Sequence, residues 1–150
     1  MPLDPSFVGH TYPTSEVYEV SRAKIREFAE SIGDDNPIYH DTAAAQSAGH
    51  PDVIAPPTFG TLLFGRYAMA DIVDDPKLGV DYGRLVHGDM KFDYARPVCA
   101  GDRLTCTTHV VEIDNRLGND FLNLRSEIDT EKGERVVTAH SQLVIRAEEA

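Results

Sequence analysis

The chain has 150 residues, a length that suits one domain, and we expect that domain to span residues 1–150. Hydrophobic residues make up 41% of the chain and charged residues 26%, so a packed core requires neither disulfides nor a metal. The formal net charge of −11 argues against a nucleic-acid partner, because the phosphate backbone would repel the protein.

The first half of the chain predicts helices. Residues 9–20 should be extended, and Ser21 is a typical helix N-cap. Gly33 is typical of the end of that first helix, and residues 42–48 predict a short second helix. The third helix is predicted from Pro57 to Val73, with apolar side chains around most of its circumference, so it should be buried on nearly all sides. The apolar stripe of the first helix has helical spacing: Ile25, Phe28, Ala29 and Ile32.

The second half predicts strands. Residues 84–98 should be extended, and turns are expected at 100–102, 115–120 and 131–134. In the three strands that follow 102, alternate residues should face one side: Leu104, Cys106, Thr108, Val110; Leu122, Leu124, Ser126, Ile128; Val137, Ala139, Ser141, Leu143, Ile145. This order indicates an α+β fold, an antiparallel sheet wrapped around a long central helix in the single hotdog arrangement. A lone sheet of this kind leaves an edge strand uncovered, so we expect a dimer.

The sequence also bears on location. It contains no run of 18 apolar residues, so we expect no membrane-spanning helix and no membrane partner. The first residues show no basic segment followed by an apolar one, which argues against a secretion signal and favours a cytoplasmic protein. Cys99 and Cys106 match no metal or redox spacing and should be partly buried thiols.

The most informative motif is in the loop after the first helix, where residues 33–41 read GDDNPIYHD. It resembles the signature of MaoC-like enzymes, Gly-Asp-x-Asn-Pro-apolar-His-x-Asp, which an alanine-rich stretch follows. The segments VIAPPTFG (53–60) and HGDMKFDYARPVCAGD (87–102) resemble further blocks of the same hotdog hydratase and dehydratase family. The chain is most similar to short single-hotdog subunits of (3R)-hydroxyacyl-thioester dehydratases, the FAS1-type dehydratase-like members.

This resemblance implies (R)-specific hydration of a trans-2-enoyl thioester, or the reverse dehydration, on acyl-CoA or acyl-carrier protein without cofactor or metal. In the family an Asp and a His share a water as acid–base pair, which points to Asp34 and His40. A backbone N–H at the start of the central helix binds the thioester oxygen, for which Thr58 is the candidate, and Asn36 should shape the loop. Expected contacts with substrate are Tyr39, Pro57 and Phe59.

Two positions depart from the family pattern. The family histidine follows the aspartate by five residues, which here is Tyr39, and His40 comes one residue later. Either the loop bulges and lets His40 reach the water, or Asp35 replaces Asp34, which restores the interval but breaks the Gly-Asp-x-Asn register. The family His-Gly at the start of the central helix is Pro56-Pro57 here, and proline has no N–H to donate.

Three functions therefore stay open. The chain is an active homodimeric hydratase that uses Asp34 and His40, or a non-catalytic acyl-binding subunit of a heterodimer whose MaoC-like partner carries the Asp/His pair. A hotdog thioesterase ranks last, because the central helix offers no carboxylate before Asp71. Docking of an acidic carrier protein would need a basic patch, for which the candidates are Arg84, Lys91, Arg96 and Arg103.

Overall fold

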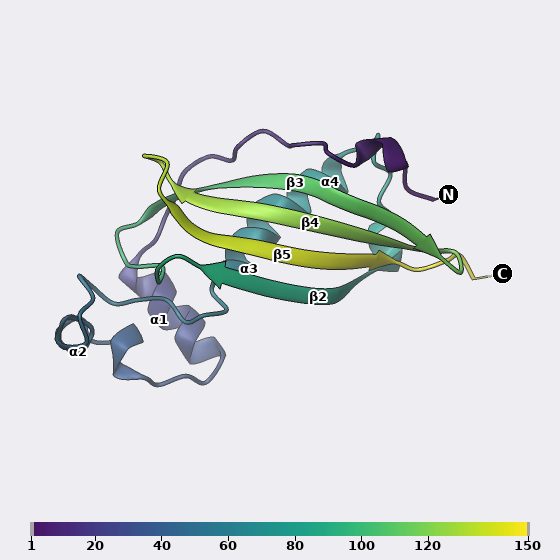
Figure 1. Cartoon of the computed structure of the whole chain (residues 1–150). Helices are drawn as coiled ribbons and strands as arrows, with labels where there is room; N and C mark the ends of the chain where they lie inside the picture. The colour runs from purple at the N-terminus through teal and green to yellow at the C-terminus, as the bar shows by residue number, and fades with distance from the viewer. Residues whose placement is uncertain (1, 150) are drawn as a thin grey trace.

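The computed structural model describes residues 2–149. Its antiparallel sheet has the strand order β1-β3-β4-β5-β2 and curves around a central helix (Figure 1), which confirms the α+β, single-hotdog prediction. The strands are β1 (Tyr18–Glu19), β2 (Leu85–Tyr94), β3 (Arg103–Arg116), β4 (Asn119–Thr130) and β5 (Arg135–Ile145). The helices are α1 (Arg22–Ser31), α2 (Thr42–Ser47), α3 (Gly60–Leu63), the π-helical segment η3 (Phe64–Ala68) and α4 (Met69–Asp74), with 3-10 turns η1 (Pro5–Phe7), η2 (Pro37–Tyr39) and η4 (Tyr82–Arg84).

The central helix consists of α3, η3 and α4, which follow one another without a break. The sequence predicted its start at Pro57, but the first helical residue is Gly60. A tighter turn precedes it, in which the Phe59 N–H donates to the Pro56 carbonyl at 2.9 Å. The predicted boundary was therefore three residues early, as is common for helix ends.

The prediction that the central helix is buried on nearly all sides was wrong. Gly65, Arg66 and Ala70 are exposed, because one sheet covers only one face of the helix. The side chains that face the sheet are at most 2% exposed: Phe59, Leu63, Phe64, Ala68 and Ile72. Burial of each of the large ones contributes about 1.5–3 kcal/mol to folding. The opposite face is open in the single chain.

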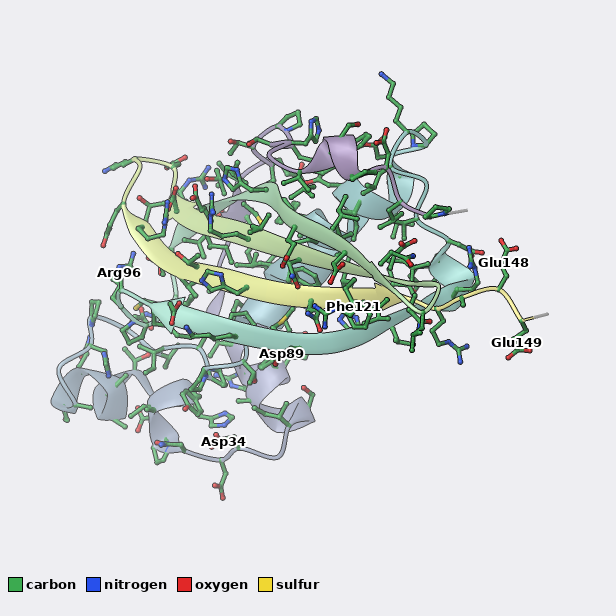
Figure 2. The ribbon with its side chains drawn as sticks, turned by 45° about the vertical axis from the view of Figure 1, so that its right-hand side comes forward. Asp34, Asp89, Arg96, Phe121, Glu148 and Glu149 are labelled. Atoms are coloured by element: carbon green, nitrogen blue, oxygen red, sulfur yellow. The ribbon has the colours of Figure 1, made fainter. Side chains whose placement is uncertain are left out.

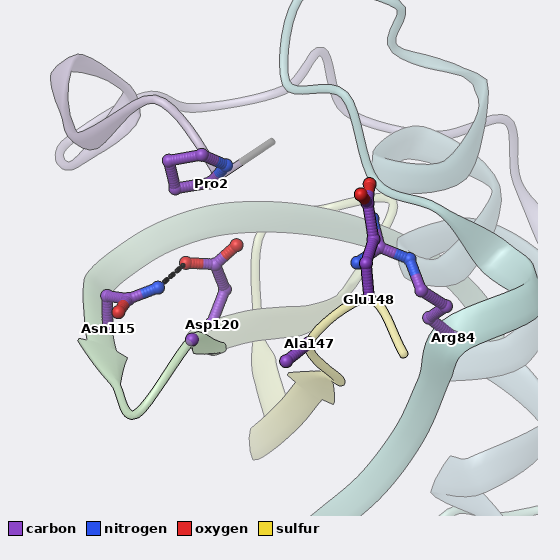
Figure 3. A pocket seen from close by; sticks show the side chains of 7 residues that line it. Pro2, Arg84, Asn115, Asp120, Ala147 and Glu148 are labelled. Carbon is purple, nitrogen blue, oxygen red and sulfur yellow. Dashed lines mark hydrogen bonds and ion pairs between the residues drawn. The ribbon is translucent and has the colours of Figure 1, made fainter. Parts of the chain in front are cut away.

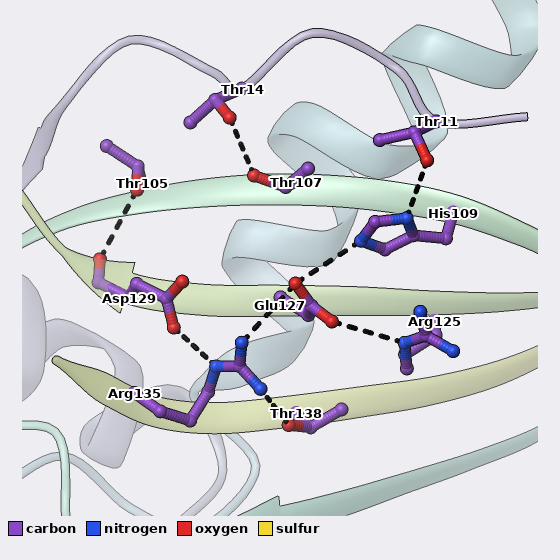
Figure 4. A network of polar contacts seen from close by, with 10 residues as sticks. All are labelled: Thr11, Thr14, Thr105, Thr107, His109, Arg125, Glu127, Asp129, Arg135 and Thr138. Carbon is purple, nitrogen blue, oxygen red and sulfur yellow. Dashed lines mark hydrogen bonds and ion pairs between the residues drawn. The ribbon is translucent and has the colours of Figure 1, made fainter. Parts of the chain in front are cut away.

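The inward-facing residues of the strands are confirmed, but the hairpin loop predicted at 115–120 is shorter, because β3 runs to Arg116 and β4 begins at Asn119. Every side chain that was expected to face one side of β3, β4 and β5 is buried. The other face of the sheet carries a polar network (Figure 4), in which Glu127 lies within 3.3 Å of His109, Arg125 and Arg135. The sheet is therefore apolar inside and polar outside, as expected for an antiparallel sheet with one solvated face.

The two edges of the sheet differ. Along β3, the N-terminal segment supplies hydrogen bonds: the Tyr12 N–H donates to the Thr108 carbonyl and the Ser15 N–H to the Cys106 carbonyl, both at 2.9 Å. Strand β2 forms the other edge and pairs only with β5 within residues 2–149. Its outer backbone groups are therefore free to pair with another strand.

Helix α1 begins as predicted, because the Ser21 side chain accepts a hydrogen bond from the Lys24 N–H at 3.0 Å. Of its predicted apolar stripe, Ile25 and Ala29 are fully buried, but Ile32 is 49% exposed. Ile32 lies outside the core because the helix ends at Ser31. No helix within residues 2–149 is long and apolar enough to cross a bilayer.

Candidate functional site

The loop that follows α1 is shaped by its own polar groups. Gly33 has a φ of +70°, a left-handed conformation that turns the chain away from the helix. The Asp34 Oδ1 accepts a hydrogen bond from the Asn36 N–H at 3.1 Å, and the Asn36 Oδ1 accepts one from the Ile38 N–H at 3.2 Å. These are local turns of the Asx type. One oxygen of the candidate catalytic carboxylate is thus engaged in holding the loop.

The His40 ring is oriented by the backbone of the same loop. Its Nε2 lies 3.0 Å from the Asp34 carbonyl oxygen, which only accepts hydrogen bonds. Nε2 therefore carries a proton, and in the neutral ring the lone pair belongs to Nδ1. An acid–base pair that shares a water needs the ring and the carboxylate to face that water. Here the ring bonds to the backbone of Asp34 rather than to its carboxylate.

Asp34 and His40 line the same open pocket on the surface, so the chain does bring them together. The pocket is strongly acidic, because the side chains that complete it include three further carboxylates and no lysine or arginine: Glu30, Gly33, Asp35, Pro37 and Asp41. Coenzyme A and the phosphopantetheine arm of carrier proteins carry negative phosphates, which such a pocket repels. The negative charge of the pocket therefore disfavours the phosphate groups of such a substrate, whereas it does not bear on the uncharged acyl thioester.

Tyr39, the residue at the family histidine position, has its side chain in the core and not in the pocket. It is 7% exposed and belongs to the core cluster that includes Ile25, Ala29 and Phe59. Burial, and secondarily the charge of Asp34, raises the pKa of its hydroxyl. Tyr39 therefore packs beneath the loop as a neutral phenol. Contact between its side chain and a substrate stays a prediction.

The start of the central helix is fixed by Tyr94. Its hydroxyl donates to the Pro57 carbonyl at 2.5 Å and interacts with the Gly60 N–H, while burial raises the pKa of Tyr94 to about 12. Sequence reasoning did not single out Tyr94, although its alternation with Phe92 in the sequence Phe-Asp-Tyr placed both residues on one face of a strand. Thr58 and Pro57 are exposed, and the Thr58 N–H has no backbone acceptor within residues 2–149.

Phe59, expected to contact substrate, has no exposed surface and packs edge-to-face on Phe28 with ring centroids 5.3 Å apart. The structure gives it a packing role. Thr58 and Pro57 are not among the residues that line the Asp34 and His40 pocket. The two parts of the candidate site thus lie in separate surface features of the single chain.

Neither His50 nor His87 lines the pocket of Asp34 and His40. His50 lines a different pocket, together with Arg96 and Cys99. His87 is exposed on β2 beside a β-bulge, and its ring lies edge-on to Phe64 at 6.2 Å. Within residues 2–149, no three His, Cys, Asp or Glu side chains are grouped as ligands for a metal ion.

The four cations considered for carrier docking are each bound to carboxylates of this chain. Arg96 is the most strongly held, with Asp102 and Glu134 both 2.8 Å away. The other pairs are Arg84 with Asp81 and Glu148, Lys91 with Asp93, and Arg103 with Glu19 and Glu131. Their charge is locally neutralised, so they form no basic patch for an acidic carrier.

Another pocket lies away from the loop: Figure 2 labels Asp34 below the sheet and Glu148 at the right-hand side, near the C-terminal end of the chain. Figure 3 shows Asp120 at its base, where this buried carboxylate accepts hydrogen bonds from the Asn115 side chain at 2.9 Å and from the Leu3 N–H at 3.0 Å. Pro2, Arg84, Gly118, Ala147 and Glu148 complete the lining. The Ala147 N–H also donates to Asn119 Oδ1 at 2.9 Å, so the segments near both ends of the chain are bonded to the β3–β4 hairpin, which is a structural role.

Comparison with known proteins identifies a matching family and relatives of the chain. A family model described as "FAS1-like, dehydratase domain region" matches residues 6–139. The UPF0336 protein SCO4636 of Streptomyces coelicolor is 56% identical over 149 residues, 99% of each chain, and a UPF0336 protein of Saccharopolyspora erythraea is 56% identical over 146 residues, 97% of this chain and 93% of the relative.

Two solved structures are also similar to the chain. A chain of the HadBC (3R)-hydroxyacyl-ACP dehydratase complex of Mycobacterium tuberculosis has a TM-score of 0.80 at 30% identity, covering 92% of this chain and 96% of that one. A MaoC-like dehydratase has a TM-score of 0.82, also at 30% identity, over 95% of this chain and 43% of that chain.

Proposed function

Because the chain belongs to the FAS1-like dehydratase family of MaoC-like hotdog proteins, we propose that it is the non-catalytic, acyl-binding subunit of a heterodimeric (3R)-hydroxyacyl-thioester dehydratase. The reaction removes water from a 3-hydroxyacyl thioester, or adds it to a trans-2-enoyl thioester. A partner subunit with an intact Asp/His pair supplies the acid–base chemistry. The observation that carries this proposal is the hydrogen bond from His40 Nε2 to the Asp34 carbonyl oxygen at 3.0 Å.

The chemistry explains why this contact matters. Hydration needs one group to take a proton from water and another to deliver a proton to the α carbon. The backbone contact of His40 Nε2–H and the loop amide bound to Asp34 Oδ1 leave only Nδ1 and Oδ2 for that exchange, and these two groups are not bonded to each other. Loss of a positioned base typically costs about 100-fold or more in rate.

The start of the central helix also favours a non-catalytic subunit. Pro57 stands where the family has the glycine whose N–H binds the thioester oxygen, and removal of one such donor typically costs about 100-fold or more. Thr58 offers a free N–H one residue later, which we propose as the remaining carbonyl donor. Two independent losses leave a weak catalyst and fit a subunit that depends on its partner.

Strand β2 supports the need for a partner. It is an edge strand of ten residues, and it carries the exposed side chain of Val86 (42% exposed). Long open edges are usually covered in native proteins, and pairing with a second sheet is one way to do so. We propose that the catalytic subunit pairs along this edge.

A self-sufficient homodimeric hydratase is the second candidate. It is favoured by the Nδ1 lone pair of His40, which is left free in the pocket that Asp34 also lines. A thioesterase gains no support, because Asp71 lies near the end of the central helix and faces Thr108 and the N-terminal segment rather than the helix start.

The experiment follows the loss of absorbance of crotonyl-CoA and of a longer trans-2-enoyl-CoA, first with the purified chain alone. A MaoC-like chain with an intact Asp-x4-His motif and His-Gly helix start is then added. We expect no turnover by this chain alone and, on mixing, turnover well above that of the partner alone. Efficient turnover by this chain alone would reject the subunit proposal and support the homodimeric hydratase.

A further inference from the structure

The inner face of the sheet is interrupted by three hydroxyl groups. Thr108 of β3, Ser126 of β4 and Ser141 of β5 are at most 5% exposed. Thr108 and Ser126 are direct cross-strand partners, and Ser141 pairs with Leu124, two residues from Ser126. The three side chains, here named the inner hydroxyl band, therefore cross three neighbouring strands beneath the central helix.

The band separates the core into two apolar clusters. On one side lie Cys106, Ile128 and Val137, which pack with side chains of α1 and α2. On the other side lie Val110, Leu124 and Leu143, which pack with Phe64, Ala68 and Ile72 of the central helix. Valine or alanine would fill the same volume as threonine or serine, so packing alone does not account for hydroxyls here.

By hydrogen-bond geometry, none of the three hydroxyls has a partner within residues 2–149, and neither does the buried hydroxyl of Tyr67. Thr108 nevertheless lies near Asp71 and Cys106, Ser126 lies near Cys106, and Tyr67 lies near Arg66. A buried hydroxyl without a partner is destabilising. Buried polar groups that lack a protein partner are commonly bonded to internal water, which needs a polar site with two to four partners. The hydroxyls of the inner hydroxyl band would supply such partners.

The band reaches towards the surface through the central helix. Tyr67 and Asp71 lie one turn apart and line a surface hollow with residues 13–16 of the N-terminal segment. Burial raises the pKa of Asp71, while the nearby Thr108 hydroxyl acts in the opposite direction. At the rim of the hollow, Arg66 faces Glu16 at 3.6 Å. Polar groups therefore continue from the hollow to Thr108 and the sheet interior.

The helix is irregular at this point. The π-helical segment η3 packs against β3, and its residue Ala68, fully buried, presents only a methyl group. Segments of this kind are rare and often occur at functional sites. Small side chains on the sheet and on the helix thus face one another where the helical hydrogen-bond pattern changes.

We propose that the inner hydroxyl band is an internal water-binding site, in which ordered water molecules bond Thr108, Ser126 and Ser141. Tyr67 and Asp71 connect this water to the surface hollow. The site is independent of the proposed dehydratase role, because it lies in neither the Asp34 loop nor the helix start.

Two measurements test the proposal. The first is a high-resolution crystal structure, which we expect to show water within hydrogen-bond distance of at least two of the three hydroxyls. The second is the Tm of Thr108→Val, a nearly isosteric change, with Thr138→Val on the outer face of β5 as control. Loss of a water-bonded hydroxyl should lower the Tm by about 2–4 °C, whereas loss of an unpaired one should raise it.

A crystal structure without water at any of the three hydroxyls would overturn the proposal, and so would a Tm of Thr108→Val above that of the wild-type protein. The control should change the Tm by less than about 2 °C in either case, because Thr138 lies on the solvated face. In crystals of Thr108→Val, the water molecule that bonds the Thr108 hydroxyl should be absent.

Discussion

Gly60 lies directly against the ring of Phe92. A β-carbon on Gly60 would stand 2.6 Å from Cε1 of that ring, closer than any real contact of this kind. The first helical residue of the central helix is thus fitted to the edge strand β2, and Tyr94 of the same strand holds the preceding turn through the Pro57 carbonyl. Phe92 and Tyr94 of strand β2 therefore pack against the start of the central helix.

The first prediction follows from this fit. Gly60→Ala should lower the free energy of unfolding by about 1–3 kcal/mol, because the methyl group forces Phe92 or the helix to move. Gly65→Ala is the matched control on the same helix, where a β-carbon meets no atom within 4 Å. It should raise stability by about 0.5–1 kcal/mol, since alanine favours the helix over glycine. Urea denaturation of the isolated chain measures both, and equal effects of the same sign would contradict the packing described here.

The second prediction concerns Arg96, which was a docking candidate on sequence grounds but holds the turn after β2. Its guanidinium bonds both Asp102 oxygens at 2.8 and 3.0 Å and the Glu134 carboxylate at 2.8 Å, and Asp102 also accepts the Cys99 N–H. Arg96→Ala should lower the free energy of unfolding by about 2–3 kcal/mol, because it leaves the part-buried Asp102 without its cation.

The control for Arg96 is Lys24→Ala, which removes a single ion pair with Glu27 at 3.1 Å on the exposed side of α1. Such pairs typically contribute less than about 1 kcal/mol. Thermal unfolding followed by circular dichroism compares the two variants. A Tm for Arg96→Ala that equals that of Lys24→Ala would show that the Arg96 network is not structural.

The third prediction is a pH dependence at Asp71. Burial raises the pKa of its carboxyl group above the ordinary value of 3.8, so the folded state binds more protons there than the unfolded state. The stabilising contribution of the neutral acid is complete below 3.8 and is lost as the pH rises through the raised value. Asparagine does not titrate, so the Asp71→Asn variant does not lose this stability as the pH rises. Its Tm relative to the wild-type protein should therefore increase from about pH 4 to pH 7, and a difference that stays constant or falls would contradict the sign of the shift.

Much of the fold was predictable because burial follows the residue pattern. Alternation placed Leu104, Cys106 and their neighbours on the inner face of the sheet, and Ser21 and Gly33 marked the ends of the first helix. The open face of the central helix was misjudged because its Gly65 and Ala70 are not polar, although Thr61 and Arg66, which are also exposed, carry polar side chains. The number of sheets that cover a helix is a property of the tertiary fold and not of the helix sequence.

The candidate site was predictable only in part. The motif placed Asp34 and His40 in one loop, and the structure has both lining one pocket. The ring orientation of His40 depends on a backbone carbonyl, a group that every residue carries, so no sequence pattern reveals it. Likewise, Phe59 was expected at the substrate, but the helix start turns its ring into the core against Phe28.

The central claim is that the acid–base pair of the working enzyme lies in the partner and not in this chain. The most direct test assembles the complex with a MaoC-like partner and measures hydration of a trans-2-enoyl-CoA for two matched double variants. One carries Asp34→Asn and His40→Ala in this chain, and the other carries the corresponding pair of substitutions in the partner. We expect the first complex to keep its activity within about threefold and the second to lose about 100-fold or more. Loss of activity in the first complex, with the second one unaffected, would place the chemistry at Asp34 and His40 and contradict the account.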